Sequence, residues 1–313
     1  KNVTMCRLFS LLKISKIMIP KHINNYSDLQ TSRGDICAGF LFQALTKTKK
    51  AEPYTKRAKE FYEAIKKINT IDELLSLENF REELISASGF SEKAKKHLTN
   101  AELIGALTDI LKKIVRESNH EFREEIIYRY LLTKGDSLGG SMRNLTGAMA
   151  GSKMASMVEQ ELRVRNLNPD VVKGRANKIQ RISWKDRCLC FDVKPKIVDK
   201  NIDMILLDCA DAALFSRDLL ETYPRYIACG ELKGGIDPAG ADEHWKTGNT
   251  SLGRIEKAFS VKKLPYLFFV GAAIEAAMAK EIFAELENGH LAHAANLHYQ
   301  NQLDDLVDWL ISL

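Results

Sequence analysis

The stretch GELKGGIDPAGADEHWKTGN, residues 230–249, is unlike the rest of the chain because it combines charge and glycine with few aliphatic residues. It directly follows the apolar run RYIAC, so its first residues are typical of the end of a buried strand. Residues two apart in a strand share one face, which places Glu231 and Lys233 side by side. A carboxylate next to an ammonium group at a strand end indicates either an ion pair or a reactive site.

Length and composition define a folded protein with a mild positive charge. The chain has 313 residues, 45% of them hydrophobic, which is enough for one large domain or two smaller ones with real cores. The net charge of +5 permits a basic groove without proving a nucleic-acid partner. The six cysteines are scattered, and no Cys/His group has the spacing of a zinc site, so we expect reduced thiols in a cytoplasm.

The N-terminal segment KNVTMCRLFSLLKISKIMIPKH has lysines and a short apolar run, but it lacks a continuous hydrophobic region and a cleavage site. Secretion is therefore not expected. No stretch reaches the roughly 18 apolar residues of a membrane span, so no membrane partner is expected either. We interpret residues 1–24 as an N-terminal extension, either amphipathic or translated from upstream of the true start.

The two halves of the remaining chain differ in their hydrophobic period. A helical stripe with steps of three and four runs through Tyr54, Ala58, Phe61, Ile65 and Ile68. Thr70 with Glu73, and Thr99 with Glu102, match the capping box that opens a helix. Residues 25–130 are thus predicted to form a mainly helical domain.

Strand-like runs dominate after residue 180. They are RCLCFDVKP, NIDMILLD, RYIACGELK and PYLFFVGAAI, and the helical segment EAAMAKEIFAELENG follows the last one. Strands with intervening helices predict an α/β layer. We expect residues 131–313 to form an α/β domain that carries the chemistry, packed with the mostly α-helical second domain.

Asp203 interrupts an apolar strand, and burial of an acid without a partner costs several kcal/mol. Together with Glu231 and the nearby Lys233, it would supply the oxygen ligands that Mg²⁺ prefers. Such a metal both neutralises a phosphodiester and activates water. A buried Asp–Lys or Glu–Lys ion pair would explain the same residues without catalysis. His244 favours catalysis, because it opens the helix after the glycine loop and can place an imidazole over the same strand ends.

Four segments carry a resemblance to a known family: GELKGGIDPAGADEHWKT, GDSLGGSMRN (135–144), SASGFSEKAKKHL (86–98) and VGAAIEAAMAKEI (270–282). They resemble the type II restriction endonucleases of the AvaI and BsoBI family, which belongs to the PD-(D/E)XK nucleases. The resemblance runs from about Tyr26 to the C-terminus and is weakest around residues 165–190. It implies an α/β catalytic core of the PD-(D/E)XK restriction-endonuclease type, with Ile202 where most such nucleases have proline.

The resemblance also implies roles for the site. Asp203 and Glu231 would bind Mg²⁺, Lys233 would stabilise the attacking water or the developing charge, and His244 would orient or deprotonate that water. The family cuts double-stranded DNA at CYCGRG to leave 5′ overhangs, as a homodimer whose domains encircle the duplex. A cognate DNA methyltransferase acts on the same site without needing to bind the enzyme. The expected location is the cytoplasm of a prokaryotic cell.

Two residues match base-contacting positions of the family, Lys93 and Asp237. Lysine donates to guanine acceptors in the major groove, and aspartate accepts from the cytosine amino group. Simpler interpretations exist for both. Lys93 lies in the lysine-rich SEKAKKH and could belong to a solvated face, while Asp237 precedes Pro238 and could cap a turn.

GDSLGGS admits other interpretations. A GDS-L hydrolase would make Ser137 a nucleophile, but that family carries the motif near its N-terminus and needs a C-terminal Asp-x-x-His, which this chain lacks. No Gly-Lys-Ser/Thr follows, which excludes a P-loop. We interpret the motif as a glycine turn whose amides, with Arg143, lie near DNA or at a subunit interface. A catalytically inactive DNA-binding relative would have lost a residue of the triplet Asp203, Glu231 and Lys233, all of which are present, and a repair nuclease would lack the EHWKT segment.

Overall fold

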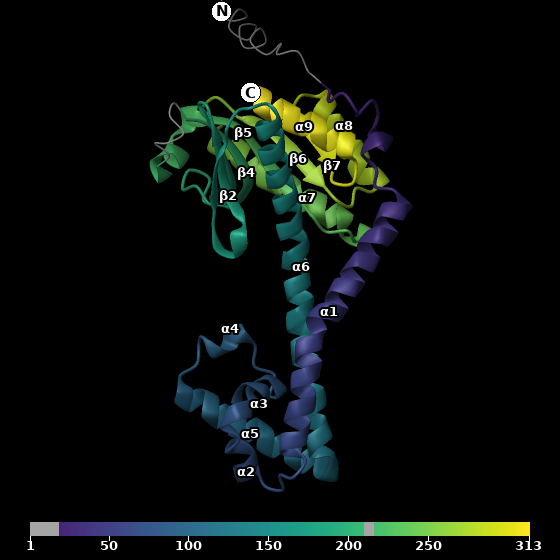
Figure 1. The fold of residues 1–313 in the computed structure, drawn as a ribbon, viewed down its shortest axis with the longest axis vertical. Coiled ribbons are helices and arrows are strands. Elements are labelled where there is room, and N and C mark those ends of the chain that lie inside the picture. Colours follow the sequence, from purple (N-terminus) through teal and green to yellow (C-terminus); the bar gives the residue numbers. More distant parts are fainter. Residues whose placement is uncertain (1–18, 210–215) are drawn as a thin grey trace, which may run out of the picture. The chain divides into compact units, whose positions relative to one another are not determined.

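A computed structural model describes residues 19–209 and 216–313, without the side chains of Glu92, Lys93, Asn119 and Arg217. The chain divides into two compact units, one formed by the residues up to 40 with 145–313 and the other by 41–144. Figure 1 shows the first unit as a sheet with helices, mostly in green and yellow, and the second as helices, mostly in blue. Within the described ranges, every helix is too short or too polar to cross a lipid bilayer.

The first unit is built on one mixed sheet, in which seven strands lie in sequence order among the described residues. Strands β1 to β5 are antiparallel, and β5, β6 and β7 are parallel. Their bounds are β1 (Asp170–Lys173), β2 (Ile179–Trp184), β3 (Arg187–Val193), β4 (Ile202–Asp208), β5 (Tyr226–Lys233), β6 (Tyr266–Gly271) and β7 (His293–Asn296). The α/β prediction is confirmed at the level of a mixed sheet with helices.

Helices cover both faces of this sheet. One face packs against α7 (Ala241–Ala258) and α8 (Ala276–Glu287), and the other against the last turns of α6 (Phe122–Val164) and α9 (Gln300–Ser312). Apolar residues from both sides of β4 are fully buried, which explains why that strand is nearly continuous in hydrophobic residues. A polar residue in such a strand therefore needs a specific partner.

The second unit is helical, as the sequence predicts for most of residues 25–130. It contains most of α1 (Arg33–Ile65), then α2 (Ile71–Leu75), α3 (Arg81–Ala87), α4 (Glu92–Lys95), α5 (Asn100–Ser118) and the first turns of α6. Phe61 and Ile65 from the predicted stripe are fully buried in its core. Both predicted helix starts are confirmed, because Thr70 Oγ1 accepts from the Glu73 amide and Thr99 forms a reciprocal cap with Glu102.

The unit boundaries differ from the predicted ranges 1–24, 25–130 and 131–313. The helices α1 and α6 each contribute to both units, so the divisions fall inside continuous helices, where composition gives no signal. Ile23, within the predicted extension, is 1% exposed in the core of the sheet unit. The remaining prediction for the extension concerns residues 1–18, which lie outside the described residues.

The interpretation of GDSLGGSMRN as a glycine turn is wrong, because residues 135–144 lie inside α6. Their amides are therefore occupied by intrahelical bonds and cannot cradle a phosphate. The Ser137 hydroxyl is also bonded within the helix, because it donates to the Thr133 carbonyl 3.0 Å away. Glycine costs about 1 kcal/mol in a helix interior, and the apolar residues Leu138 and Met142, buried on one side of α6, offset that cost.

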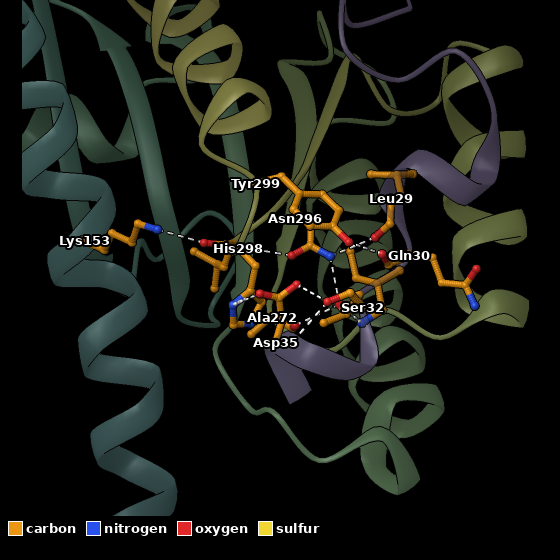
Figure 2. Close-up of polar contacts among 12 residues, drawn as sticks. Leu29, Gln30, Ser32, Asp35, Lys153, Ala272, Asn296, His298 and Tyr299 are labelled. Carbon is orange, nitrogen blue, oxygen red and sulfur yellow. Dashed lines mark hydrogen bonds and ion pairs between the residues drawn. The ribbon is translucent and has the colours of Figure 1, made fainter. Parts of the chain in front are cut away.

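A buried polar cluster fixes the segment before α1 to the ends of β6 and β7 (Figure 2). Asn296, 0% exposed, donates to the Leu29 carbonyl at 2.9 Å and to Thr31 Oγ1 at 2.8 Å. The Thr31 hydroxyl in turn donates to the Ala272 carbonyl at 2.9 Å. Every polar group in this chain of contacts has a partner, as buried polar groups require. We name it the Asn296 cluster.

Replacement of a glycine in the GDSLGGS segment tests its helical conformation. A Cβ at Gly135 would meet nothing within 4 Å, so Gly135→Ala should raise the free energy of unfolding by about 0.5–1 kcal/mol through helix propensity. Gly89→Ala is the control in the same unit, because Gly89 has a φ of +84° and alanine there should destabilise by about 1–2 kcal/mol. Urea unfolding measures both. If both variants lower the free energy of unfolding by the same amount, the segment around Gly135 is a turn and not a helix.

Candidate active site

Two carboxylates meet where β4 and β5 end their pairing. Met204 pairs with Gly230, so the next residues, Asp203 and Glu231, face each other across the two strands. Asp203 Oδ2 accepts a 2.7 Å hydrogen bond from the Leu232 amide, in the place where a backbone carbonyl would otherwise accept. Glu231 is 5% exposed, whereas Asp203 is half-buried. The sequence prediction that these acids lie on adjacent strands is correct.

Lys233 completes the triplet at the last position of β5. Its Nζ lies 2.6 Å from Glu231 Oε1, and its side chain is 18% exposed. The Lys233 carbonyl accepts from the Ala272 amide at 2.8 Å, and Ala272 is itself held by Thr31 of the Asn296 cluster. The backbone that carries the ammonium group is therefore fixed from the far side of β6.

The electrostatics of the pair are unfavourable to two negative charges. Burial, and then the nearby Asp203 carboxylate, raise the pKa of Glu231 to about 7, although Lys233 and a side-chain hydrogen bond with Ser251 act in the opposite direction. Burial also raises the pKa of Asp203, opposed by its hydrogen bond from the Leu232 amide and by the charge of Lys233. Perturbed carboxylates of this kind gather at functional sites.

The glycines of the quoted stretch allow close approach of other elements. A Cβ at Gly234 would lie 2.4 Å from the Thr146 carbonyl oxygen on α6, and a Cβ at Gly235 would lie 2.6 Å from His244 Nε2. A side chain at either position would thus displace α6 or the imidazole. Glycine is dense here because the chain leaving β5 is enclosed on both sides.

His244 lies in the first turn of α7, half-buried beside this glycine loop. Its neighbour Trp245 anchors the helix: it is 1% exposed, its ring packs edge-on against Phe269 at 5.1 Å, and its Nε1 donates to Glu281 at 2.6 Å. A fixed Trp245 sets the rotation of α7 and so holds the imidazole over Gly235. Ser251, two turns later on α7, reaches Glu231.

Sequence reasoning missed three side chains around the triplet. Asp192 on β3 lies opposite Asp203, because the pairs Phe191–Met204 and Val193–Ile202 flank it. Lys178 Nζ contacts Asp192 Oδ2 at 3.0 Å. Ser251 could have been found, because it is seven residues after His244 and therefore on the same helix face. Asp192 required the strand register.

The predicted DNA-contacting residues fall in different places. Asp237 is exposed, and its Oδ1 accepts from the Ala239 amide at 3.0 Å, so it caps the short turn before α7. Arg143 is exposed on α6 and belongs to the other unit. Lys93 lies on α4, and its side chain is outside the described part of the chain. Asp237 alone is in the same unit as the triplet.

The donor set can be compared with what a divalent cation requires. Within the described ranges, no group of three or more His, Cys, Asp and Glu side chains has a metal-binding arrangement. Asp203 and Glu231 nevertheless place two carboxylates side by side, and Mg²⁺ commonly uses one or two carboxylates with waters and substrate phosphates. Two crowded acids with raised pKa values are the groups that a cation would relieve.

Comparison with known proteins identifies the family. The sequence profile described as "Restriction endonuclease BsobI" matches residues 19–183 and 169–313. The chain is 38% identical to the type II restriction enzyme AvaI of a Nostoc species over 311 residues, 93% of this chain and 98% of that enzyme. It is also 38% identical to the type II restriction enzyme BsoBI of Geobacillus stearothermophilus over 314 residues, 93% and 97% of the two chains.

The mixed sheet with its helices is thus consistent with the fold of a restriction endonuclease. The chain belongs to the BsobI restriction endonuclease family, and both matched regions together cover all of the described residues. The sequence-based assignment to this family is confirmed.

The raised pKa of Glu231 predicts that the free energy of unfolding depends on pH. A carboxyl whose pKa is raised on folding, here from 4.5 to about 7, contributes stability at low pH that is lost as the pH rises through this range. Compared with Glu231→Gln, the wild type should lose on the order of 3 kcal/mol between about pH 4.5 and pH 7, at 1.36 kcal/mol per pH unit. Urea unfolding without divalent metal measures this difference.

Asp203→Asn provides a matched comparison for the same titration. This substitution removes the negative charge of Asp203, which is the second cause of the raised Glu231 pKa. Stability should then be lost over a narrower pH range. A difference between wild type and Glu231→Gln that stays constant from pH 4.5 to pH 7 would contradict the buried, crowded site.

Proposed function

We propose that the chain is a type II restriction endonuclease that hydrolyses phosphodiester bonds in double-stranded DNA with Mg²⁺. We further infer a catalytic core of the PD-(D/E)XK type, with Asp203, Glu231 and Lys233 as its triplet. The observation that carries the proposal is the placement of two carboxylates and one ammonium group together at the ends of β4 and β5. The family supports the same reaction class.

An ion pair with a purely structural role would not require this arrangement. One acid is enough to neutralise Lys233, yet two acids are present, and the charge of Asp203 raises the pKa of Glu231. Replacement of such a group by apolar residues is often neutral or stabilising, so an arrangement that costs stability indicates a role in function. The loss of the triplet that would mark an inactive DNA-binding relative is not found in this sequence.

The residues divide the chemistry among them. Asp203 and Glu231 would hold the cation, which when bound stabilises the negative charge of the reacting phosphate. Lys233 would stabilise the attacking water or the charge that develops on the phosphate. His244, held over Gly235, would orient that water or accept its proton, which is a common role of imidazole in general acid–base catalysis.

Recognition of the DNA site is proposed from the resemblance. The expected site is the palindrome CYCGRG, cut to leave 5′ overhangs by a homodimer that presents each recognition residue twice. The helical unit, with Lys93 and Arg143, would embrace the duplex. A cognate methyltransferase would modify the same site. Asp237 is the candidate in the same unit as the triplet, and its side chain is exposed although its Oδ1 caps a turn.

Two substitutions test the triplet. Glu231→Gln and Lys233→Ala should each lower the rate of DNA cleavage in Mg²⁺ at least about 100-fold, because they remove charge at the scissile phosphate. Specific binding should remain largely intact, since neither residue contacts base edges. Single-turnover cleavage and gel-shift binding of one duplex measure the two effects separately.

The matched controls carry the same chemical changes at exposed positions, Glu287→Gln at the end of α8 and Lys263→Ala before β6. Both should cut like the wild type. Near-normal turnover by Lys233→Ala would show that the triplet is assigned incorrectly.

Asp237 is tested by base discrimination. If it accepts from a cytosine amino group, Asp237→Ala should weaken binding to CTCGAG and CCCGGG by about 1–3 kcal/mol per half-site, without the same loss for singly changed sites. Salt must be held fixed, because phosphate contacts dominate the background affinity.

Asp237→Asn is the control for the capping role, because asparagine caps a turn as well as aspartate but offers a donor as well as an acceptor. It should keep the stability of the wild type and lose the discrimination. If both variants keep the wild-type ratio between cognate and changed sites, Asp237 serves only as a cap.

A further inference from the structure

The turn between β1 and β2, residues 173–178, lies at the same end of the strands as the catalytic triplet. Lys173 pairs with Ile179, so the turn closes at this end of the hairpin. The register then continues across the sheet: the pairs Arg181–Cys190 and Phe191–Met204 lead from the hairpin to the strand end that carries Asp203. In Figure 1 this hairpin includes the strand labelled β2. We name residues 173–178 the basic turn.

The basic turn reaches the site directly through one side chain. Lys178 Nζ lies 3.0 Å from Asp192 Oδ2, and Asp192 faces Asp203 across the pairing of β3 and β4. Only one strand therefore separates the turn from the first carboxylate of the triplet. A ligand that runs from the reacting phosphate across the strand ends, from β4 over β3, would meet the turn next.

The charge of the turn is entirely positive. Its sequence, KGRANK, contains three basic residues and no acid. Lys178 is paired with Asp192, but Lys173 and Arg175 are exposed and have no ion-pair partner among the residues that the structure describes. Two unpaired cations at the edge of a site that acts on a phosphodiester are suited to a polyanion.

The backbone of the turn is held in a fixed and unfavourable conformation. Ala176 and Asn177 have φ values of 54° and 59°, in the left-handed region, which costs roughly 1–2 kcal/mol for a residue such as alanine. The Gly174 amide donates to the Lys178 carbonyl at 2.8 Å and closes the loop. Strain of this kind is retained where a surface must be presented in one geometry.

We propose that the basic turn contacts the DNA phosphate backbone beside the scissile bond, through Lys173 and Arg175. The inference rests on the proposed nuclease function and adds a specific contact to it. Lys178 holds the turn against Asp192 and is the positioning residue, while Lys173 and Arg175 remain available for phosphates. Such contacts fix the position of the duplex without reading sequence.

The salt dependence of binding tests this inference. Each phosphate contact contributes about 0.9 to the slope of log K against log salt, so Lys173→Ala/Arg175→Ala should flatten the slope by about 1.8 per bound chain. Between about 50 and 200 mM salt, the Kd of this variant should then rise roughly tenfold less than that of the wild type. Fluorescence anisotropy in EDTA measures the Kd and its salt slope. The change in slope should be the same for a cognate and an unrelated duplex.

Two further variants control for charge and position. Lys185→Ala/Lys263→Ala removes two exposed positive charges near the opposite edge of the sheet, where the turn between β2 and β3 lies and β6 begins, and should keep the wild-type slope. Lys173→Arg/Arg175→Lys keeps both charges and should also keep the slope. Equal unfolding midpoints in urea exclude a folding defect.

The possible failures are distinguishable. If the wild type binds DNA and the Lys173→Ala/Arg175→Ala slope is unchanged, the basic turn has no phosphate contacts, and the proposed function stands. If that variant instead changes only the oligomeric mass in size-exclusion chromatography, the turn contacts a second copy of the chain, which also overturns the inference. If the wild type binds no DNA, both the inference and the proposed function fail.

Discussion

The central constraint on this structure is the crowding of Asp203 and Glu231 at the ends of two buried antiparallel strands. The protein holds the two acids together by giving Asp203 the Leu232 amide as a donor and Glu231 the ammonium group of Lys233. Burial nevertheless raises both pKa values, and the Asp203 carboxylate adds to the shift at Glu231. The site therefore holds two crowded carboxylates, which in the proposed function a divalent cation and a phosphate would complete.

The surrounding elements act to keep that edge rigid. Trp245 locks α7 onto the sheet and thereby places His244 over the glycine loop. The Asn296 cluster fixes Ala272, which holds the backbone of Lys233 from the neighbouring strand. Catalytic groups must be held within a fraction of an ångström of their working geometry, so in the proposed function these supports belong to the site.

The sequence revealed those parts of the fold and site that depend on local pattern. Glu231 and Lys233 follow from a period of two, and Asp203 from the conflict between an acid and an apolar strand. Asp192 could not be found in this way, because its place opposite Asp203 depends on the register between β3 and β4. The prediction of a turn at the glycines of residues 135–140 is wrong because it follows local propensity, whereas the packing of α6 imposes a helix.

Digestion of a mapped plasmid, with run-off sequencing of the ends, tests the central claim most directly. The wild type is incubated with Mg²⁺ or with EDTA, beside Asp203→Asn in Mg²⁺. The account predicts cuts at CYCGRG sites with 5′ overhangs in the first reaction only, because the anion pair needs a cation to engage the phosphate. Full cutting in EDTA, or by Asp203→Asn, would contradict it.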